Sequence, residues 1–562
     1  LLFFKQKTAY EISDSDWSSD VCSSDLSKLG ALSADNIKVV PNPMETEAGQ
    51  VPVTINGIFP EKYMKKKAVV TVTPVLRYNG QSVAGSPATF QGEKVQGNDQ
   101  TISYLVGGHY TMKSNFKYVP EMQKSELYLT FDAKVGKKAV NVPEIKVADG
   151  IIATSELYKE TMKSSQACLM PDAFQRIVEQ KQVANVNFLI QQAELRKSEL
   201  KNNSVKEFVN LLNEINNDRE RLNLTNIEVS AYASPDGGVK LNDKLANKRQ
   251  QNSEKFVGQQ LKKAKMQADV DANYTAQDWE GFQELVKASN IQDKDVILRV
   301  LSMYKDPEER EAQIKSMSSA FRELADGILP QLRRARMTIN YELIGRSDAQ
   351  IEEQLKADAK ELSVEEMLYS ATLTNDCAEK AARYTKTAEI YPNDARAFNN
   401  LATLAYANGD YNKAKDYLNK AVAVSNKAAE AKANLGMIAL QSGDVKTAET
   451  LISQAAGANG LGEVLGNLHI AQGNYAQAAI DFGNSNSNSA ALAQLLNKDY
   501  ASALQTLSRV KNANGVTDYL KAIINARQGN NSAAAQALKS ALAKDPSLQK
   551  YAANDLELKN VK

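Results

Sequence analysis

The chain has 562 residues, a formal net charge of +1 and an ordinary globular composition, with 43% hydrophobic and 24% charged side chains. A chain of this length exceeds what a single hydrophobic core supports, so length alone predicts about three or four domains. The balanced charge excludes a bulk electrostatic attraction to nucleic acid or to an anionic membrane surface, although it leaves room for a local patch.

Histidines and cysteines are too few and too scattered to predict metal binding or histidine-based catalysis. The only histidines are His109 and His469, and Cys22, Cys168 and Cys377 lie far apart. The sequence holds no CxxC pair, no HExxH and no closely spaced set of metal ligands. Nor does it hold a nucleophile with a base, a paired carboxylate set or a phosphate loop. We therefore expect no metal, no cofactor, no catalytic residue and no enzyme activity.

Residues 1–26 have no helical or strand period, and the composition changes abruptly at Ser27. The segment resembles a translated sequencing adapter fused to a gene fragment, and we expect it to be a disordered artefact outside the fold. The alternative is a natural disordered leader rich in Ser and Asp. No later apolar run approaches the roughly 20 residues that a membrane-spanning helix needs.

Residues 27–155 have the pattern of a β-sandwich-like domain. Apolar and polar residues alternate in short runs such as KAVVTVTPVL and ELYLTFDA, and turns such as Tyr78-Asn79-Gly80 separate these runs. Alternation with a period of two predicts short antiparallel strands, and many such strands with frequent turns predict a sandwich or barrel. We expect this domain to present a surface to a partner or to support its neighbours.

Residues 156–182 are rich in Lys, Glu and Gln and read as a mostly helical connector. Cys168 lies in an apolar stretch of this connector. An isolated cysteine is most often a small buried hydrophobe, and we expect that role here.

Residues 183–346 alternate between strand-like and helix-like segments. The expected strands are 184–190, 226–232, 269–275 and 335–344, and the expected helices are 205–215 and 241–263. Interleaved strands and helices predict a sheet with helices packed on one face. An insertion at about 277–328 has apolar residues three and four apart, which predicts amphipathic helices.

The junction IEVSAYASPDGGVKLNDKLANKRQ within this region resembles the core of the OmpA-type peptidoglycan-binding domain. In that family a strand ends in a Gly-Tyr-Thr-Asp-like turn, and Asn-x-x-Leu-(x)n-Arg follows on a helix. Tyr232 ends the strand, Gly237 falls at the turn glycine, and Asn242, Leu245 and Arg249 fall on the family's Asn, Leu and Arg. The insertion, with its DWEGF start and DPEERE stretch, is similar to insertions in OmpA-type envelope proteins of the Bacteroidota.

The resemblance implies peptidoglycan as a ligand. In the family, the arginine and a turn aspartate hold the diaminopimelate of the peptide stem, whose carboxylate and amino groups call for opposite charges. Here Ser234 stands at the aspartate position, and Asp236 lies two residues later. Either Asp236 reaches the ligand ammonium, or it caps the turn while Arg249 makes a structural ion pair. Arg333 and Arg334 stand where the family has a second basic position, or they are solvated helix-end charges.

Residues 350–548 are alanine-rich, helical in pattern and repetitive. Several residues recur 34 positions apart, which is the tetratricopeptide period; the pairs are Leu401 and Leu435, Gly409 and Gly443, Ala414 and Ala448, and Ala421 and Ala455. Small residues allow close helix contact, and the turn glycine permits a positive φ. We predict about six units, some shortened, stacked into an all-α solenoid, with a C-terminal tail at 549–562.

A solenoid of this family implies a concave face that binds a protein or peptide. The candidate groove residues are Asn399, Asn400, Asn434 and Asn467. Their chemistry names no particular ligand.

Taken together, the sequence predicts a multidomain α+β protein that acts as a non-enzymatic scaffold in the cell envelope, in the periplasm or at the outer membrane. In this hypothesis the OmpA-like domain contacts peptidoglycan and the repeats bind an unidentified protein, while nucleic acid is not a partner. The family context implies an outer-membrane lipid anchor upstream of the first residue. The alternative is a subunit of an outer-membrane or surface assembly complex whose OmpA-like domain no longer binds peptidoglycan, which Ser234 favours.

Overall fold

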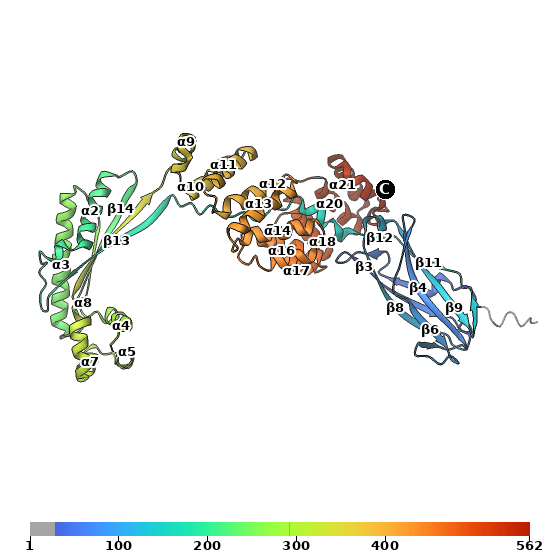
Figure 1. Cartoon of the computed structure of the whole chain (residues 1–562), viewed down its shortest axis with the longest axis horizontal. Helices are drawn as coiled ribbons and strands as arrows, with labels where there is room; N and C mark the ends of the chain where they lie inside the picture. Colours follow the sequence, from blue (N-terminus) through green and yellow to red (C-terminus); the bar gives the residue numbers. More distant parts are fainter. Residues whose placement is uncertain (1–28, 292, 562) are drawn as a thin grey trace, which may run out of the picture. The chain divides into compact units, whose positions relative to one another are not determined.

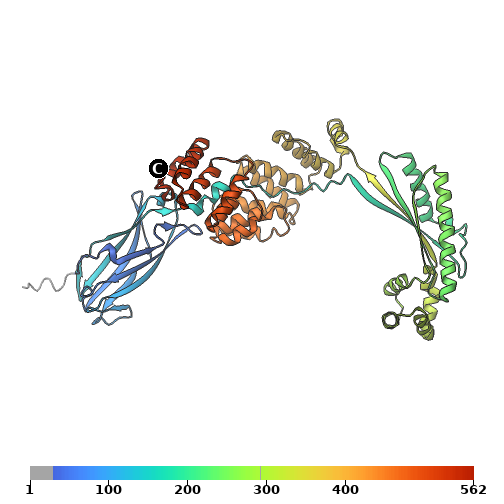
Figure 2. The ribbon, with the colours of Figure 1, turned by 180° about the vertical axis from the view of Figure 1, so that it is seen from behind.

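The computed structural model describes residues 29–291 and 293–561, and the prediction for residues 1–26 lies outside them. The chain forms two compact units. Unit 1 combines the chain up to Pro171 with the part from Thr374 onward, and unit 2 is Asp172–Leu373. Unit 2 is therefore inserted, in sequence, between the two parts of unit 1. Figures 1 and 2 show the elements of both units from opposite sides.

The first part of unit 1 is a β-sandwich. Its strands are β1 (Ile37–Val40), β2 (Met44–Glu45), β3 (Gln50–Phe59), β4 (Ala68–Tyr78), β5 (Gln81–Ala84), β6 (Ala88–Gly92), β7 (Gln100–Ile102), β8 (Gly108–Lys117), β9 (Ser125–Val135), β10 (Lys138–Val140), β11 (Ile145–Asp149) and β12 (Ile151–Ile152), with short 3-10 helices η2 (Ala34–Asn36) and η3 (Pro120–Gln123). One sheet has the order β1-β3-β8, and the other has the path β10-β9-β4-β6-β7.

The alternation of side chains explains this sandwich. Along β4, alternate residues are buried, so Val70 and Val72 enter the core while Thr71 and Thr73 stay at its margin. A strand that alternates in this way packs one face against the opposing sheet. Most of the pairs are antiparallel, as the sequence predicts, whereas β6 with β7 and β12 with β2 are parallel.

The connector is helical only in its first part. The 3-10 helix η4 (Thr154–Leu157) and the short helix α1 (Tyr158–Met162) are followed by residues without regular structure, and strand β13 already begins at Ile177. The prediction of a mostly helical segment at 156–182 is therefore wrong. Pro171 disfavours a helical conformation in the residue before it, and the backbone there bonds to the repeat helices instead.

The second part of unit 1 is the repeat array. Its helices are α11 (Cys377–Ile390), α12 (Ala395–Ala407), α13 (Tyr411–Val424), α14 (Ala429–Gln441), α15 (Val445–Ile452), α16 (Leu461–Ala471), α17 (Tyr475–Phe482), α18 (Asn488–Leu496), α19 (Tyr500–Ser508), α20 (Gly515–Arg527) and α21 (Asn531–Lys544). The helices pack as successive antiparallel pairs (Figure 1). Gly409, Gly443, Gly473 and Gly529 have positive φ at equivalent turns, and Ala414, Ala421, Ala448 and Ala455 are buried.

The last residues belong to the fold of the array. The 3-10 helix η8 (Pro546–Leu548), helix α22 (Gln549–Asn554) and the 3-10 helix η9 (Leu556–Leu558) follow α21. Leu558 is fully buried in the same core as the repeat helices. The predicted C-terminal tail at 549–562 is thus replaced by packed helical turns, because its apolar residues cover the end of the array.

Unit 2 is an α/β domain with helical additions. It contains strands β13 (Ile177–Asn187), β14 (Leu222–Tyr232), β15 (Val270–Thr275) and β16 (Arg334–Ile344), helices α2 (Asn203–Asn217) and α3 (Val239–Lys263), a short 3-10 turn η5 (Glu199–Lys201), the inserted helices α4 (Trp279–Ala288), α5 (Lys294–Met303), α6 (Pro307–Ser316), α7 (Ser318–Glu323), the π-helical turn η6 (Leu324–Ile328) and α8 (Leu329–Leu332), and finally α9 (Asp348–Asp358), η7 (Ala359–Glu361) and α10 (Val364–Ser370).

The sheet of unit 2 has the strand order β13-β16-β14-β15, in which only β14 and β15 are parallel. Helices α2 and α3 bury Phe208 and Val257 against strand residues such as Ile227 and Met337, so both helices cover the same face (Figure 2). The insertion has a small core of its own. Helices α9 and α10 belong to unit 2, so the repeat array begins later than the predicted residue 350.

Candidate functional site

The first helix of each repeat pair carries polar residues toward one groove of the array. Asn399 on α12, Asn434 on α14 and Asn467 on α16 stand at nearly equivalent positions of successive repeats, and Asn400 follows Asn399. Repeats that stack with a regular rotation align equivalent side chains along one face. All four asparagines are buried, with at most 3% of their surface exposed.

The groove is filled by the chain's own residues 158–170, which we call the groove segment. The side chain of Asn434 accepts a hydrogen bond from the Cys168 backbone N–H at 2.7 Å and donates one to the Cys168 carbonyl at 2.8 Å. Asn399 donates to the same carbonyl at 2.9 Å. Asn400 bonds the N–H of Met170 at 3.0 Å and its carbonyl at 2.9 Å. The side-chain amides therefore bond the backbone of an extended peptide in the way that a neighbouring β-strand would.

Further along the groove the segment meets the later repeats. The hydroxyl of Ser489 on α18 donates to the Thr161 hydroxyl at 2.9 Å and lies 3.2 Å from the Ser165 hydroxyl. Asn467 contacts Ser165 at 3.4 Å. The Tyr406 hydroxyl donates to the Met162 carbonyl at 2.9 Å. From Ser165 to Met170 the groove segment thus runs against the order of the repeats, from α18 back to α12.

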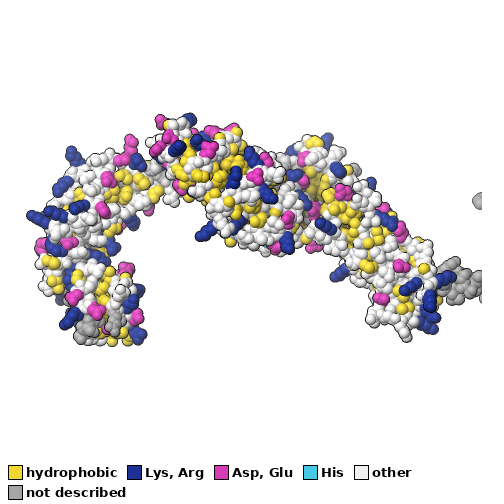
Figure 3. Space-filling view, viewed as in Figure 1, with side chains coloured by type: hydrophobic (Ala, Val, Ile, Leu, Met, Phe, Trp, Pro, Cys, Tyr) yellow, Lys and Arg dark blue, Asp and Glu magenta, His cyan; other side chains and the backbone are white. Residues whose placement is uncertain are grey.

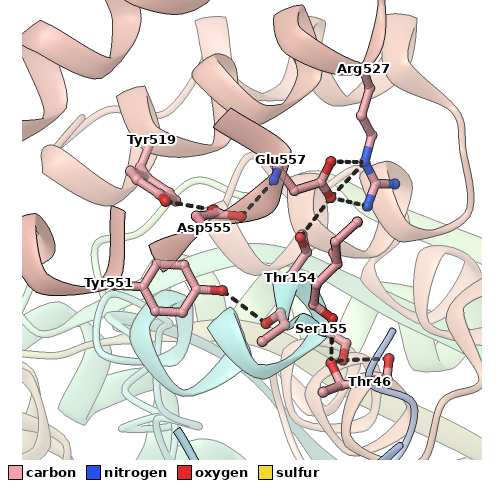
Figure 4. Close-up of polar contacts among 10 residues, drawn as sticks. Thr46, Thr154, Ser155, Tyr519, Arg527, Tyr551, Asp555 and Glu557 are labelled. Atoms are coloured by element: carbon pink, nitrogen blue, oxygen red, sulfur yellow. Dashed lines mark hydrogen bonds and ion pairs between the residues drawn. The ribbon is translucent and has the colours of Figure 1, made fainter. Parts of the chain in front are cut away.

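Residues 153–155, just before the connector, are bonded to the last helices and to the β-sandwich, as Figure 4 shows. The Thr154 hydroxyl donates to Glu557 at 2.8 Å, and Arg527 bonds the same carboxylate. The Tyr551 hydroxyl donates to the Ala153 carbonyl at 2.9 Å. The Ser155 hydroxyl lies 2.7 Å from that of Thr46 in the sandwich. Both ends of the groove segment are therefore held inside unit 1.

The groove segment also makes apolar contacts with the repeat helices. Leu157, Tyr158, Met162, Cys168 and Met170 all belong to the hydrophobic core of the repeat helices. Burial raises the pKa of the Cys168 thiol to about 12, with Glu430 and Glu463 adding to the rise. A thiol in this environment stays protonated and unreactive at neutral pH.

The predicted groove asparagines therefore lie together in a groove and hold an extended peptide, but this peptide comes from the chain itself. The sequence did not predict that the groove segment is the ligand of this groove. The one signal in the sequence is Pro171, because the residue before a proline disfavours a helix. The structure shows the extended pattern there, with Cys168 and Met170 buried and Leu169 exposed between them.

A second polar cluster lies in unit 2, at the end of β14, and it contains the predicted peptidoglycan-binding residues. Arg333 makes an ion pair with Asp236 at 3.0 Å and donates to the Ser234 hydroxyl at 3.3 Å. The Ser234 hydroxyl in turn donates to Asp236. Asn242 holds the turn by donating to the Ser234 and Gly237 carbonyls, at 3.0 and 2.9 Å. The acid at position 236 is therefore paired within the domain.

Arg249 lies beneath this turn, and only 1% of its surface is exposed. Two helical turns separate it from Asn242 on α3, so both side chains leave the same face. Its guanidinium donates to the carbonyls of Gln192 at 3.0 Å, Tyr232 at 2.9 Å and Leu189 at 3.4 Å. Burial, with the nearby Arg333 charge, lowers its pKa to about 10. Arg249 thus remains charged at neutral pH and fastens the ends of two strands.

Arg334 forms a separate pair in the same unit. Its guanidinium lies 2.9 Å from Asp278 and stacks over the Tyr232 ring at 4.7 Å. Both partners of the ion pair are largely buried, so Arg334 is not a solvated helix-end charge. The structure brings Ser234, Asp236, Asn242, Arg249 and Arg333 into one network and places Arg334 beside it.

Comparison with known proteins bears on the repeat region. Residues 405–460 match the sequence model of the tetratricopeptide repeat family. This match confirms the repeat period that the sequence predicts, so the array contains tetratricopeptide repeats. None of the curated proteins compared with the chain matches it.

Several solved structures are similar to the chain at low identity. A tetratricopeptide repeat protein from Parabacteroides merdae is 15% identical over 44% of this chain and 97% of its own, with a TM-score of 0.28. YrrB, described as a repeat protein with an unusual peptide-binding site, is 15% identical over 38% and 100%, with a TM-score of 0.20. Yeast Tom70 is 12% identical over 57% and 74%, with a TM-score of 0.24.

Two kinds of feature are absent from the described residues. No group of three or more His, Cys, Asp or Glu side chains in residues 29–291 and 293–561 is arranged to hold a metal ion. Within the same ranges, no helix combines the length and the apolar character needed to cross a membrane.

Proposed function

We propose that the chain is a non-enzymatic scaffold of the cell envelope whose tetratricopeptide array keeps its own connector as a permanent groove ligand. The observation that carries this proposal is the set of amide bonds from Asn399, Asn400 and Asn434 to the backbone of Cys168 and Met170. The match of residues 405–460 to the repeat family supports the scaffold role. The envelope location rests on the resemblance of the β14–α3 junction to OmpA-type domains.

A permanent ligand follows from the energetics of the groove. The groove segment is covalently tied to unit 1, so its effective concentration at the groove is on the order of millimolar or higher. An incoming peptide would have to displace several buried hydrogen bonds and expose Met162 and Cys168, which are fully buried or nearly so. Each buried donor left without a partner costs about 1–3 kcal/mol. Partners of this scaffold therefore bind to other surfaces than the groove.

Thiol labelling tests the permanent ligand. In the Cys22→Ser chain we expect Cys377, which is exposed, to react at once with a thiol reagent at mildly alkaline pH, and Cys168 to react only on unfolding. The raised pKa of Cys168 adds to its protection. Ionisation of that thiol would destabilise the folded chain, so this contribution to stability is present below the ordinary thiol pKa and is lost as the pH rises toward 12.

A synthetic peptide of residues 156–171 that carries the change Cys168→Ser, and so cannot consume the thiol reagent, is added in large excess and provides the decisive comparison. We expect it to leave the labelling rate of Cys168 unchanged, with the Cys22→Ser/Cys377→Ser chain as the control that isolates this thiol. Faster labelling in the presence of the peptide would show that the groove exchanges its ligand, and the permanent-ligand proposal would then be abandoned.

For the α/β domain we propose the second of the two functions that the sequence allows, an assembly subunit whose OmpA-like domain does not hold peptidoglycan. Two observations support this choice. Three N–H groups of Arg249 are engaged by backbone carbonyls, and Asp236 is paired with Arg333. A diaminopimelate group would need an accessible guanidinium and an accessible carboxylate, and here each is used by the domain itself.

Pelleting of the full chain with purified peptidoglycan tests this second point. We expect the wild type to stay in the supernatant, and the Asp236→Ala and Arg333→Ala variants to behave in the same way. A bovine serum albumin sample measures trapping in the pellet. If the wild type pelleted and Asp236→Ala abolished the effect in a folded chain, the carboxylate would be a ligand-binding group and the wall-contact hypothesis would replace ours.

A further inference from the structure

One end of the β-sandwich is formed by four loops, residues 60–67, 93–99, 103–107 and 136–137, which we call the distal loops. They join the strands where β3, β6, β7 and β9 end and where β4, β7, β8 and β10 begin. The opposite end of the sandwich carries Thr46 and the entry to the connector, which contact the array. The distal loops therefore lie on the side of the sandwich that is turned away from the groove.

Backbone hydrogen bonds join the distal loops into one surface. The N–H of Lys62 donates to the Tyr104 carbonyl at 2.6 Å, and the N–H of Lys94 donates to the Lys66 carbonyl at 2.7 Å. The N–H of Gly136 donates to the Lys67 carbonyl at 2.9 Å. The Lys65 ammonium lies 5.4 Å from the centre of the Tyr104 ring. These contacts thus connect the backbones of the four loops, all but one of which contain lysines.

The loop 103–107 presents two aliphatic side chains to solvent. Leu105 is 64% exposed and Val106 is 80% exposed, the largest value among the large hydrophobic side chains of the described residues. The loop is closed by a bridge between Ser103 and Gly107, and the Ser103 hydroxyl accepts the N–H of Leu105 at 3.2 Å. The turn therefore holds both side chains outward, although aliphatic groups in water are unfavourable.

The charge around this apolar tip is positive. The distal loops contain six lysines, Lys62, Lys65, Lys66, Lys67, Lys94 and Lys137, against the three acids Glu61, Glu93 and Asp99, whereas the whole chain has a net charge of only +1. The Glu93 carboxylate accepts a hydrogen bond from the Ser103 hydroxyl at 3.0 Å. Figure 3 shows Lys and Arg side chains gathered at this end of the sandwich.

From this placement we infer that the distal loops are a docking surface for an anionic phospholipid bilayer. Lysines that face a bilayer are attracted by lipid phosphates and by the negative surface potential. Leu105 and Val106 gain free energy only if they leave water for an apolar phase, which a bilayer provides and a soluble polyanion does not. An exposed aliphatic loop on a surface that carries six lysines combines both contributions. In this arrangement the distal loops bind the bilayer, and the opposite end of the sandwich contacts the repeat array.

Vesicle co-sedimentation of the full chain tests this inference. We expect binding to vesicles of phosphatidylcholine with phosphatidylglycerol, weak binding to pure phosphatidylcholine, and loss of binding at high salt. Lys66→Glu/Lys67→Glu should weaken binding by at least about tenfold, because each lysine near an anionic surface contributes roughly a fivefold factor. Leu105→Ser/Val106→Ser should also weaken it by about tenfold, since the aliphatic insertion is removed.

Matched variants separate the tip from general effects. Lys262→Glu/Lys263→Glu makes the same charge change at an exposed pair on α3, and Ile480→Ser removes another exposed aliphatic side chain. Both should bind as the wild type does. Val106→Trp in a Trp17→Phe/Trp279→Phe chain should show a blue-shifted emission on binding, which a surface contact by lysines alone would not produce.

Three outcomes would overturn the inference. The first is no preference for anionic vesicles, and the second is binding that the two tip variants leave unchanged. The third is a serine double variant that binds as well as wild type while soluble polyphosphate competes fully, which would define a polyanion site instead. None of these results would alter the proposal for the groove, because the thiol assay reports on a different part of unit 1.

Discussion

Replacement of Asn434 by alanine should destabilise unit 1 by about 3 kcal/mol and open the groove. The change removes the bonds to the N–H and carbonyl of Cys168 and the bond to the Asn399 side-chain oxygen. The buried N–H of Cys168 then lacks an acceptor, and the side-chain oxygen of Asn399 lacks a donor. Each such unsatisfied group costs about 1–3 kcal/mol. Labelling of Cys168 in the Cys22→Ser chain under native conditions measures the opening, and urea unfolding measures the stability.

Asn419→Ala is the matched control for this prediction. Asn419 is an exposed residue on α13, and the same substitution there should change stability by less than about 0.5 kcal/mol. Labelling of Cys168 in Asn434→Ala at the wild-type rate, with an unchanged urea midpoint, would contradict the view that the asparagines hold the groove segment. It would mean that the apolar contacts alone keep the segment in place.

Replacement of Arg249 by alanine should destabilise unit 2 by about 4 kcal/mol. Three backbone carbonyls lose their donor, and a large buried side chain leaves a cavity. Burial of the charge and the repulsion from Arg333 both lower the pKa of Arg249, and removal of these two unfavourable effects offsets part of the cost. Arg249→Lys should recover only part of the loss, because an ammonium cannot reach three divergent carbonyls as a guanidinium fork does. Trp279, which lies in unit 2, reports unfolding by fluorescence in the Trp17→Phe chain.

The control for Arg249 is Arg336→Ala, which removes an exposed arginine of β16 in the same unit and should leave the midpoint within about 0.5 kcal/mol of wild type. The prediction also separates the two interpretations of Arg249. A variant that keeps the wild-type stability but abolishes pelleting with peptidoglycan would make Arg249 a ligand-binding residue, contrary to the structural role proposed here.

Local sequence patterns were sufficient for the strands of the sandwich, the strands and helices of the α/β sheet and the repeat helices, but not for the connector or the last residues. The alternation in 68–78 and the 34-residue spacing of Gly409 and Gly443 each reflect a side-chain period that one strand or one repeat imposes on its neighbours. The junction after β14 could also be placed on a strand, a turn and a helix, because a turn rich in Pro and Gly separates two periodic segments. In unit 2 the structure has these elements at the predicted places, although β13 and β14 begin several residues earlier than expected.

The partners of the polar residues could not be predicted in the same way. Asp236 pairs with Arg333, which lies 97 residues later, and nothing near either residue in the sequence specifies that contact. Arg249 looked like a ligand-binding arginine by its place in a motif, and only the fold shows that loop carbonyls from 189 and 192 reach its guanidinium. The sequence thus shows which charged and polar groups a region contains, whereas the distances in the folded chain determine which partners these groups bind.

The sequence by itself determined the class of each region: a strand-rich first part, an interleaved α/β part and a stack of tetratricopeptide repeats with asparagines on one face. Only the tertiary structure decided that this face is occupied by residues 158–170, that the last helical turns pack into the array, and that Leu105 and Val106 stand among lysines of other loops. The physical reason is the range of the forces involved. Side-chain periods are set within a few residues, whereas the groove contacts join residues more than 200 positions apart, and such contacts exist only once the whole chain has folded.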